Sequence, residues 1–410
     1  MPKYNYTAKN PATGKVSKST IEAENEQEAV KSIKAEGLVP LDLKGEKVVS
    51  SVGLGNKLNR IKAKDKVLFF RQLSTLINAG LPLSQSLRNV SSQTKNKALT
   101  SIIVTIINNV EGGKTFSDSL AKYPKVFSRV VINLVGAGET SGTLDTSLER
   151  IANQLEKDSD ISSKIRGAMI YPIVIVCVML AVVVFMMVKV VPQIETLYTS
   201  FPGTTLPIET RVLLSISHFI TKYWWIVFLV VIIFGITLFR WIRTKAGTRV
   251  FDSIKINTPP FKTLFRMIYM ARFSRTAATL IGAGVPLLNV LQITAENVAN
   301  YQVEQSIKKA AEKVKGGKSL GDSLTGDPNF LPLVPNMLKI GEVSGSVESM
   351  LNKSADYYEK EVDNIISTIS TIVEPIMMVL LGVVAMIIVA AILLPIYSLA
   401  GSGAISSGGI

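Results

Sequence analysis

The chain has 410 residues, of which 47% are apolar, and its mean hydropathy is +0.33. This length allows several modules, the hydropathy excludes an ordinary soluble protein, and the single cysteine, Cys177, excludes a disulfide within the chain. A formal net charge of +14 makes nucleic-acid binding one alternative to consider.

The first 45 residues predict a small α+β domain. YNYTA and KVSKSTIEA alternate like strands, an amphipathic helix from Asn25 to Gly37 follows, and VPLDL is a third short strand. Since no apolar signal segment is present in the first thirty residues, we expect this domain to stay in the cytosol. Residues 46–65 are rich in Gly, Ser and Lys and predict a linker.

Two cytosolic segments, residues 66–168 and 240–371, each predict a helical bundle. Apolar residues recur there at three- and four-residue steps, which is the helical period. Ala-Gly-x-Pro in each segment predicts a corner between helices, because glycine adopts the left-handed conformation and proline disfavours continuation. We therefore predict a mainly α, polytopic membrane protein with two repeated cytosolic bundles, a small α+β N-terminal domain and three transmembrane helices.

The three predicted membrane spans cover residues 169–191, 224–239 and 372–396. About 20 predominantly apolar residues are needed to cross roughly 30 Å of hydrocarbon as a helix, so the second span is the shortest and needs its flanks. Trp224 and Trp241 at its two ends fit the aromatic belts of membrane interfaces.

The basic residues predict the orientation of these spans. The loop 192–223 holds only two of them, Arg211 and Lys222. The segment after the second span holds Arg240, Arg243, Lys245, Arg249, Lys255, Lys262 and Arg266. By the positive-inside rule the loop is extracytoplasmic, and so is the tail 397–410, while the N-terminus is cytosolic. This topology accounts for most of the basic excess and disfavours nucleic-acid binding.

The chain contains an internal repeat. FFRQLSTLINAGLPLSQSL at residues 69–87 aligns with FSRTAATLIGAGVPLLNVL at a spacing of 204 residues. Gly-Glu-x-Ser-Gly at residues 138–142 recurs at a spacing of 203 residues. Two copies can share one side of a membrane only if an even number of spans separates them. The second span is therefore the unrepeated return crossing.

EGGKTFSDSL, at residues 111–120, contains the Gly-Lys-Thr ending of a phosphate-binding loop, and KGGKSLGDSL repeats it. Such a loop also needs a glycine five residues earlier, and Asn108 and Glu312 occupy those positions. A helix that ends at Gly-Gly, followed by a hydroxyl N-cap at Thr115, explains the same letters. We favour this structural interpretation over nucleotide binding.

Residues of common catalytic and metal sites are scarce. His218 is the only histidine and lies in the predicted extracytoplasmic loop, so we predict no catalytic residue, cofactor or metal site and no enzymatic activity. Acidic pairs such as Glu139 with Asp145 leave open the binding of a divalent cation by their carboxylate oxygens. A transporter or channel component is the alternative function, but Lys189 and Glu374 lie near span ends, where snorkelling explains them.

The duplicated Ala-Gly-x-Pro, Gly-Gly-Lys-Ser/Thr-x-x-Asp-Ser-Leu and Gly-Glu-x-Ser-Gly elements resemble the type IV pilus and type II secretion inner-membrane platform family (PilC/GspF type). Residues 164–192 look like its signature, although Met179 stands where that pattern favours a smaller residue. The resemblance implies a multi-pass protein of the inner membrane that couples a cytosolic hexameric ATPase to pilin extraction and filament assembly. The sequence does not distinguish whether the filament is an adhesive pilus, a DNA-uptake pilus or a secretion pseudopilus.

The partners implied by the resemblance are the assembly or retraction ATPase, pilins, other pilus inner-membrane assembly proteins, membrane lipid and further copies of the chain. Four charged residues that both copies keep are hypothesised to couple to a partner: Arg71, Arg275, Glu139 and Glu342. An ion pair within each bundle is the alternative explanation for them. Pro172 and Pro375 lie a few residues inside their spans, where each is expected to kink its helix or act as a hinge.

Overall fold

The computed structural model describes residues 3–9, 16–22, 30, 33–34, 39–45, 60–193, 196, 208–259 and 261–401. The chain divides into two compact units. One comprises Met1–Lys62 with Lys95–Ser101, and the other comprises Ala63–Thr94 with Ile102–Ile410.

The first unit contains a three-stranded antiparallel sheet of β1 (Lys3–Lys9), β2 (Val16–Glu22) and β3 (Val39–Gly45) in the order β2-β1-β3. All three strands lie where the sequence predicts them, with Tyr6 opposite Ser19 on one side. The predicted helix from Asn25 to Gly37 lies largely outside the described residues. The α+β character of this domain therefore stays a prediction, and so does most of the linker 46–65.

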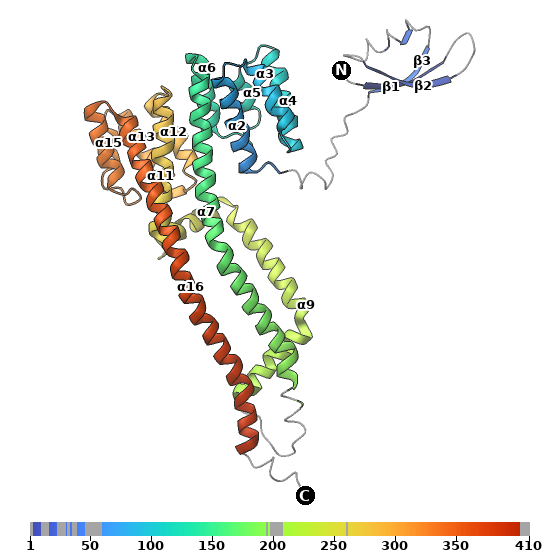
Figure 1. Cartoon of the computed structure of the whole chain (residues 1–410), viewed down its shortest axis with the longest axis vertical. Coiled ribbons are helices and arrows are strands. Elements are labelled where there is room, and N and C mark those ends of the chain that lie inside the picture. The colour runs from blue at the N-terminus through green and yellow to red at the C-terminus, as the bar shows by residue number, and fades with distance from the viewer. Residues whose placement is uncertain are drawn as a thin grey trace. The chain divides into compact units, whose positions relative to one another are not determined.

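Twelve of the described helices fall into two equivalent series. The first repeat contains α2 (Ala63–Asn78), α3 (Leu83–Gln93), α4 (Lys97–Glu111), α5 (Phe116–Ala121), α6 (Arg129–Ser141) and α7 (Leu144–Phe185). The second repeat contains α11 (Phe261–Gly282), α12 (Leu287–Asn297), α13 (Tyr301–Lys315), α14 (Leu320–Leu324), α15 (Leu333–Ser344) and α16 (Val347–Gly401). The two series lie beside each other (Figure 1).

Each repeat buries its own aromatic core, and the two cores use equivalent positions. Phe69 packs against Phe127 with ring centroids 6.2 Å apart, and Phe273 packs edge-on against Phe330 at 5.1 Å. All four rings are buried, with at most 6% of their surface exposed. Burial of such large apolar side chains contributes about 1.5–3 kcal/mol each, so each bundle has the core of an independent helical domain.

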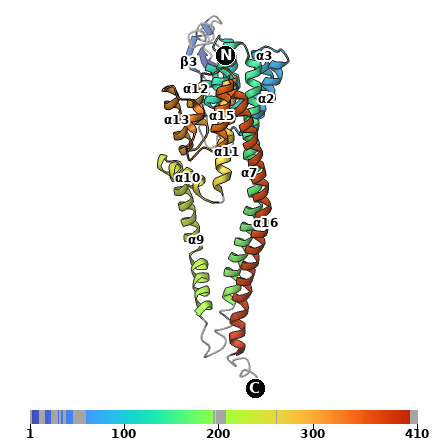
Figure 2. The same cartoon turned by 90° about the vertical axis from the view of Figure 1, so that its left-hand side faces the viewer.

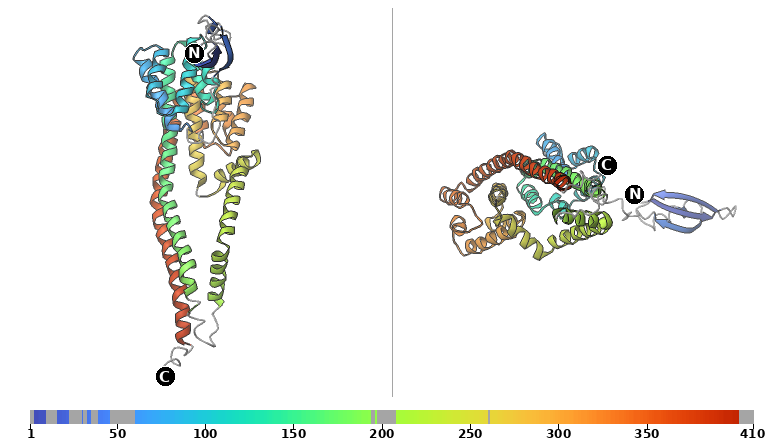
Figure 3. Two further views of the ribbon diagram at one scale, coloured as in Figure 1. Left: turned by 90° about the vertical axis from the view of Figure 1, so that its right-hand side faces the viewer. Right: turned by 90° about the horizontal axis from the view of Figure 1, so that it is seen from below.

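The final helix of each repeat continues without a break from its bundle into an apolar segment. One helical stretch covers Leu144–Gln193, through α7 and a π-helical turn, η2 (Met186–Val190), which at 1.5 Å per residue is about 75 Å long. α16 does the same in the second repeat. The two helices contact each other and run side by side in the same direction (Figures 2 and 3).

The second apolar segment is bent. It belongs to α9 (Ile208–Ile242), in which Tyr223 leaves helical geometry (φ −115°, ψ 23°). The arms Ser217–Tyr223 and Phe228–Ile242 differ in direction by 81°. Among the described residues, two helices are long and apolar enough to cross a membrane, and a third crossing needs both arms of this bent pair. The prediction of three transmembrane helices is therefore not confirmed by the structure.

Part of the predicted extracytoplasmic loop is helical, because α9 begins sixteen residues before the predicted second span. Leu214, near the start of α9, is buried in a cluster with Met186 and Val191 at the end of the first long helix. The Ser217 hydroxyl donates to the Met187 carbonyl, which belongs to the π-helical turn, at 2.5 Å. α10 (Lys245–Asn257) then leads into the second repeat.

Candidate coupling site between the two repeats

The repeated Gly-Gly-Lys-Ser/Thr loop is a helix-capping structure in both repeats. Gly113 and Gly317 end α4 and α13 in the left-handed region, with φ of 83° and 89°. The Thr115 hydroxyl then accepts the Asp118 N–H at 3.1 Å as the N-cap of α5. Ser319 does the same for Asp322 in the second repeat. The structural interpretation of this motif is confirmed.

Glu139 and Glu342 cap the same short helices from the side. The Glu139 carboxylate accepts the backbone N–H groups of Phe116 at 2.5 Å and Ser117 at 2.9 Å. Glu342 accepts those of Leu320 at 2.5 Å and of the following glycine at 3.0 Å. Charge-assisted bonds to N–H groups that a helix leaves unsatisfied explain why an acid is needed in Gly-Glu-x-Ser-Gly.

The two glycines of Gly-Glu-x-Ser-Gly have separate structural roles. A Cβ on Gly138 would lie 2.5 Å from the Ser147 hydroxyl oxygen, so glycine allows α6 to approach α7. A Cβ on Gly341 would lie 2.8 Å from the Cα of Val347 in the second repeat. Gly142 ends α6 with φ of 74°, a left-handed C-cap that other residues rarely adopt. The motif therefore fixes the corner between α6 and α7.

Arg71 and Arg275 occupy equivalent positions and make equivalent contacts. Arg71 on α2 donates to Glu156 on α7 at 2.7 and 2.5 Å and to Asn153 at 2.6 Å. Arg275 on α11 donates to Glu359 on α16 at 2.9 and 3.0 Å. Asn352 accepts a further hydrogen bond from Arg275 at 2.9 Å, and Asp356 forms an ion pair with it. For the two arginines, the structure therefore contains the alternative explanation, an ion pair within each repeat.

These contacts shift the ionisation of the groups involved. The hydrogen bond with Glu156 raises the pKa of Arg71, and the same bond lowers the pKa of Glu156. Burial opposes the charge of Arg275, but hydrogen bonds to Glu359 and Asp356 raise its pKa overall. Desolvation raises the pKa of Asp158, although Arg272 opposes this shift. The arginines of this group lie on α2 and α11, and the carboxylates lie on α7 and α16.

Five ion pairs among the described residues join the first repeat to the second. They are Arg129–Glu296 (2.8 Å), Arg150–Glu348 (3.0 Å), Lys157–Glu359 (3.3 Å), Asp158–Arg272 (3.6 Å) and Lys164–Asp363 (2.6 Å). Most of these side chains are partly exposed, so each pair contributes at most about 1 kcal/mol. Because α7 supplies four of the pairs, together they set the register between the repeats.

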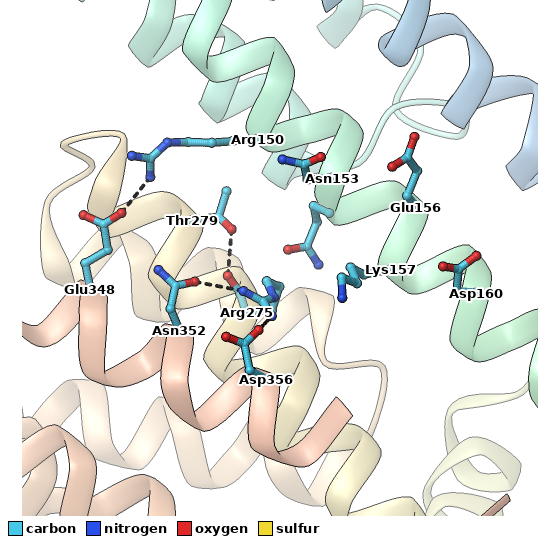
Figure 4. A pocket seen from close by; sticks show the side chains of 11 residues that line it. Arg150, Asn153, Glu156, Lys157, Asp160, Arg275, Thr279, Glu348, Asn352 and Asp356 are labelled. Carbon is cyan, nitrogen blue, oxygen red and sulfur yellow. Dashed lines mark hydrogen bonds and ion pairs between the residues drawn. The ribbon is translucent and has the colours of Figure 1, made fainter. Parts of the chain in front are cut away.

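A polar cavity of about 380 Å³ opens along this junction (Figure 4). Arg150 and Glu156 reach it from α7, Arg275 reaches it from α11, and Glu348 and Asp356 reach it from α16. Arg275 and the carboxylate that binds Arg71 therefore meet at one place, although they come from different repeats. The mixture of cations and anions suits water and alternative ion pairing better than a ligand of one charge.

The two proline positions lie inside continuous helices. Pro172 is within α7 and Pro375 is within α16, and both helices extend well beyond them. A proline in such a position removes one backbone hydrogen bond. Their role as kinks or hinges, like the partner-coupling role of the four charged residues, stays a prediction.

Sequence reasoning missed the partners across the junction. Arg150, Lys157 and Lys164 recur at every seventh position of α7, and all three pair with acids of α16. A seven-residue spacing of charges is typical of the flanks of paired helices.

Comparison with known families agrees with this architecture. A family model described as type II secretion system (T2SS) protein F matches residues 69–192 and, a second time, residues 273–395. The model of the protein F N-terminal domain matches residues 1–44. The two matches of the first model correspond to the two structural repeats. The chain therefore belongs to the type II secretion system protein F family.

Relatives of nearly the same length carry two kinds of name. A type IV pilus assembly protein PilC from Thermus thermophilus is 37% identical over 98% of this chain and 99% of its own length. The PilC of Pseudomonas aeruginosa is 34% identical over 90% and 97%. A type II secretion system protein F from Vibrio cholerae is 34% identical over 94% and 95%.

Proposed function

We propose that this chain is the inner-membrane platform of a type IV pilus, or of the related type II secretion machine. It is a component of the assembly machinery and not an enzyme. In this proposal its cytosolic bundles couple a hexameric ATPase to the extraction of pilins from the bilayer and to filament assembly. Pilins, other inner-membrane assembly proteins and further copies of the chain are its partners.

The observation that carries the proposal is the continuity of the two long helices. α7, continued by η2, and α16 each start inside a bundle and run through an apolar segment, with no loop in between. Lys164–Asp363 and an apolar cluster around Val362 and Ile366 hold them together below the bundles. A displacement imposed on either bundle would therefore reach the membrane as movement of a rigid pair.

The proposed topology places the N-terminus and both bundles in the cytosol and the C-terminus outside it. The bent α9 then forms the second of three crossings, and it returns the chain to the side from which α7 leaves. The proposed domains are those predicted from the sequence, with residues 1–45 as a separate domain. Reporter fusions at Lys62, at Thr204 and at the C-terminus would test these three positions independently.

A matched pair of variants tests rigid coupling. Ser162 and Ser163 are exposed on α7 between the first bundle and the apolar segment. Replacing both with glycine weakens the helix by about 2 kcal/mol relative to replacing both with alanine. We expect the glycine variant to lose filament assembly while it still inserts in the membrane and co-purifies with the ATPase. The alanine variant should assemble filaments as the unmodified chain does. Normal assembly by the glycine variant would contradict the proposal.

A further inference from the structure

The junction between the two repeats uses only half of the surfaces that the repeats possess. In the first repeat, α6 and α7 contact α11, α12 and α16 of the second. Because the repeats are equivalent, α15 and α16 of the second repeat carry a surface that corresponds to the α6–α7 surface of the first. In the same way, α2, α3 and α7 of the first repeat carry a surface that corresponds to the one on α11, α12 and α16. Apart from Asn153, Glu156 and Asp160 of α7, which line the internal cavity, these two faces are not used between the repeats.

The charges of the unused faces match. Arg150 pairs with Glu348 across the junction, and the equivalent positions, 203 residues later and earlier, hold Lys353 and Asp145. Both are exposed, and among the described residues Lys353 has no ion-pair partner. A positive and a negative charge therefore recur at the equivalent positions, Lys353 and Asp145, which do not meet within one chain.

A second pair shows the same relationship. Lys157 pairs with Glu359, which its own repeat also binds through Arg275. The equivalent of Lys157 is Lys360, which is exposed and without an ion-pair partner among the described residues. The equivalent of Glu359 is Glu156, which is already bound by an arginine of its own repeat. The other three cross-repeat pairs have no equivalent pair of opposite charges.

The unused face of the second repeat is also more apolar than its counterpart. Thr140 and Ala137 on α6 line the groove that faces the α11–α12 corner, and their equivalents on α15 are Val343 and Ile340. Val343 is 92% exposed, more than any other large apolar side chain in the described chain, and Ile340 is 52% exposed. A neighbouring groove of about 480 Å³ includes Tyr357, which is half exposed.

We propose that a second copy of this chain docks on this face and repeats the internal junction between molecules. The α15–α16 face of one copy packs on the α2–α3 corner and α7 of the next, with Lys353 opposite Asp145 and Lys360 opposite Glu156. Such a contact is head-to-tail, so it closes into a ring or continues as an open chain. The inference deepens the proposed function by naming the surface through which its copies associate.

The direction of the long helices favours a copy over another occupant. α7 and α16 run in the same direction (Figure 2), so the operation that relates the repeats keeps the apolar segments parallel. Applying this operation again would place the second copy's apolar helices in the same membrane. A partner without this repeat would have no reason to match both the charge pairs and the membrane plane.

Cross-linking between copies tests the proposal, with the internal junction as a control. Asn133 and Asn289 are exposed and line the same internal groove, and their equivalents are Asn336 and Gln85. In a Cys177→Ser background, we expect N133C with N289C to give an intramolecular product with a short bismaleimide. Two differently tagged chains, one with N336C and the other with Q85C, should give a covalent heterodimer in native membranes.

The outcomes are distinct. Cross-linking of the control pair without the heterodimer would overturn the proposal, and so would heterodimer yields no higher than those of N336C or Q85C alone. Because the product is measured in membranes, its absence is separable from failure of ATPase coupling or filament assembly.

A charge exchange tests the assigned register. Lys353→Glu in one chain, or Asp145→Lys in its partner, should each reduce the heterodimer yield about twofold to fivefold, as expected for a partly exposed ion pair. Combining the two changes should restore the yield. Failure of the combination to restore it, with the control cross-link intact, would overturn the assigned pairing of these surfaces.

Discussion

Arg71 and Glu156 bind each other through two hydrogen bonds, of 2.7 and 2.5 Å, although 85 residues separate them in the chain. This pair joins α2 to α7, and Arg275 and Glu359 join α11 to α16 in the same way. A structural role for the arginine is therefore present in both repeats, and a role in partner binding has to be separated from it by experiment.

Exchange of the two charges separates these roles. We expect Arg71→Glu alone to lower the free energy of unfolding by about 1 kcal/mol, because the carboxylate of Glu156 would then face another carboxylate. Arg71→Glu combined with Glu156→Arg should recover most of that stability, measured by thermal unfolding in detergent. If Arg71 contacts the ATPase, the exchanged variant should still fail to co-purify with it. Recovery of both stability and co-purification would leave only the structural role.

Replacement of Glu139 by glutamine should weaken the end of α5. A glutamine amide accepts one of the two backbone N–H groups and repels the other, so we expect a loss of about 1–2 kcal/mol. Glu342→Gln should have a similar effect because its contacts are the same. Glu312→Gln, at an exposed position on α13, is the matched control. Thermal unfolding midpoints equal to that of the control would refute the capping role.

Alanine at Gly138 should disturb the approach of α6 to α7. The added methyl group would meet the Ser147 side chain at 2.5 Å and the Leu144 Cα at 3.1 Å. Overpacking of this kind costs about 1–3 kcal/mol. Gly167→Ala is the control, because a Cβ there meets nothing within 4 Å and alanine favours the helix. Equal unfolding midpoints for the two variants would show that the close approach is not needed.

Acid should remove part of the stability that Glu156 contributes. Its pKa in the folded chain is lower than its ordinary value of 4.5, chiefly because of the Arg71 hydrogen bond. A lowered pKa stabilises the fold above the unfolded-state pKa, and this contribution is lost as the pH falls through the lower, folded-state pKa. The difference in unfolding midpoint between the unmodified chain and Glu156→Gln should therefore be constant above about pH 5 and shrink below pH 4.5. A difference that persists at low pH would contradict this account.

Much of the local structure was predictable because short-range chemistry decides it. Gly113 and Thr115 end one helix and begin the next through bonds to residues within a few positions, and the same letters in the second repeat do the same. The strands near Tyr6, the corners at Ala-Gly-x-Pro and the apolar runs of α7 and α16 follow from patterns of this length. The bend at Tyr223 was not predictable, since no proline or glycine stands beside it to mark a break in the helix.

The sequence alone determined that this protein has two copies of a helical bundle, each joined to an apolar helix, because repetition and hydrophobic period are properties of the chain itself. Only the tertiary structure decided how the copies meet. Arg150 and Glu348 lie 198 residues apart, and no local pattern selects one carboxylate among the many that a partly exposed arginine could reach. Their pairing depends on α7 and α16 lying side by side, and that arrangement also leaves Lys353 facing outward.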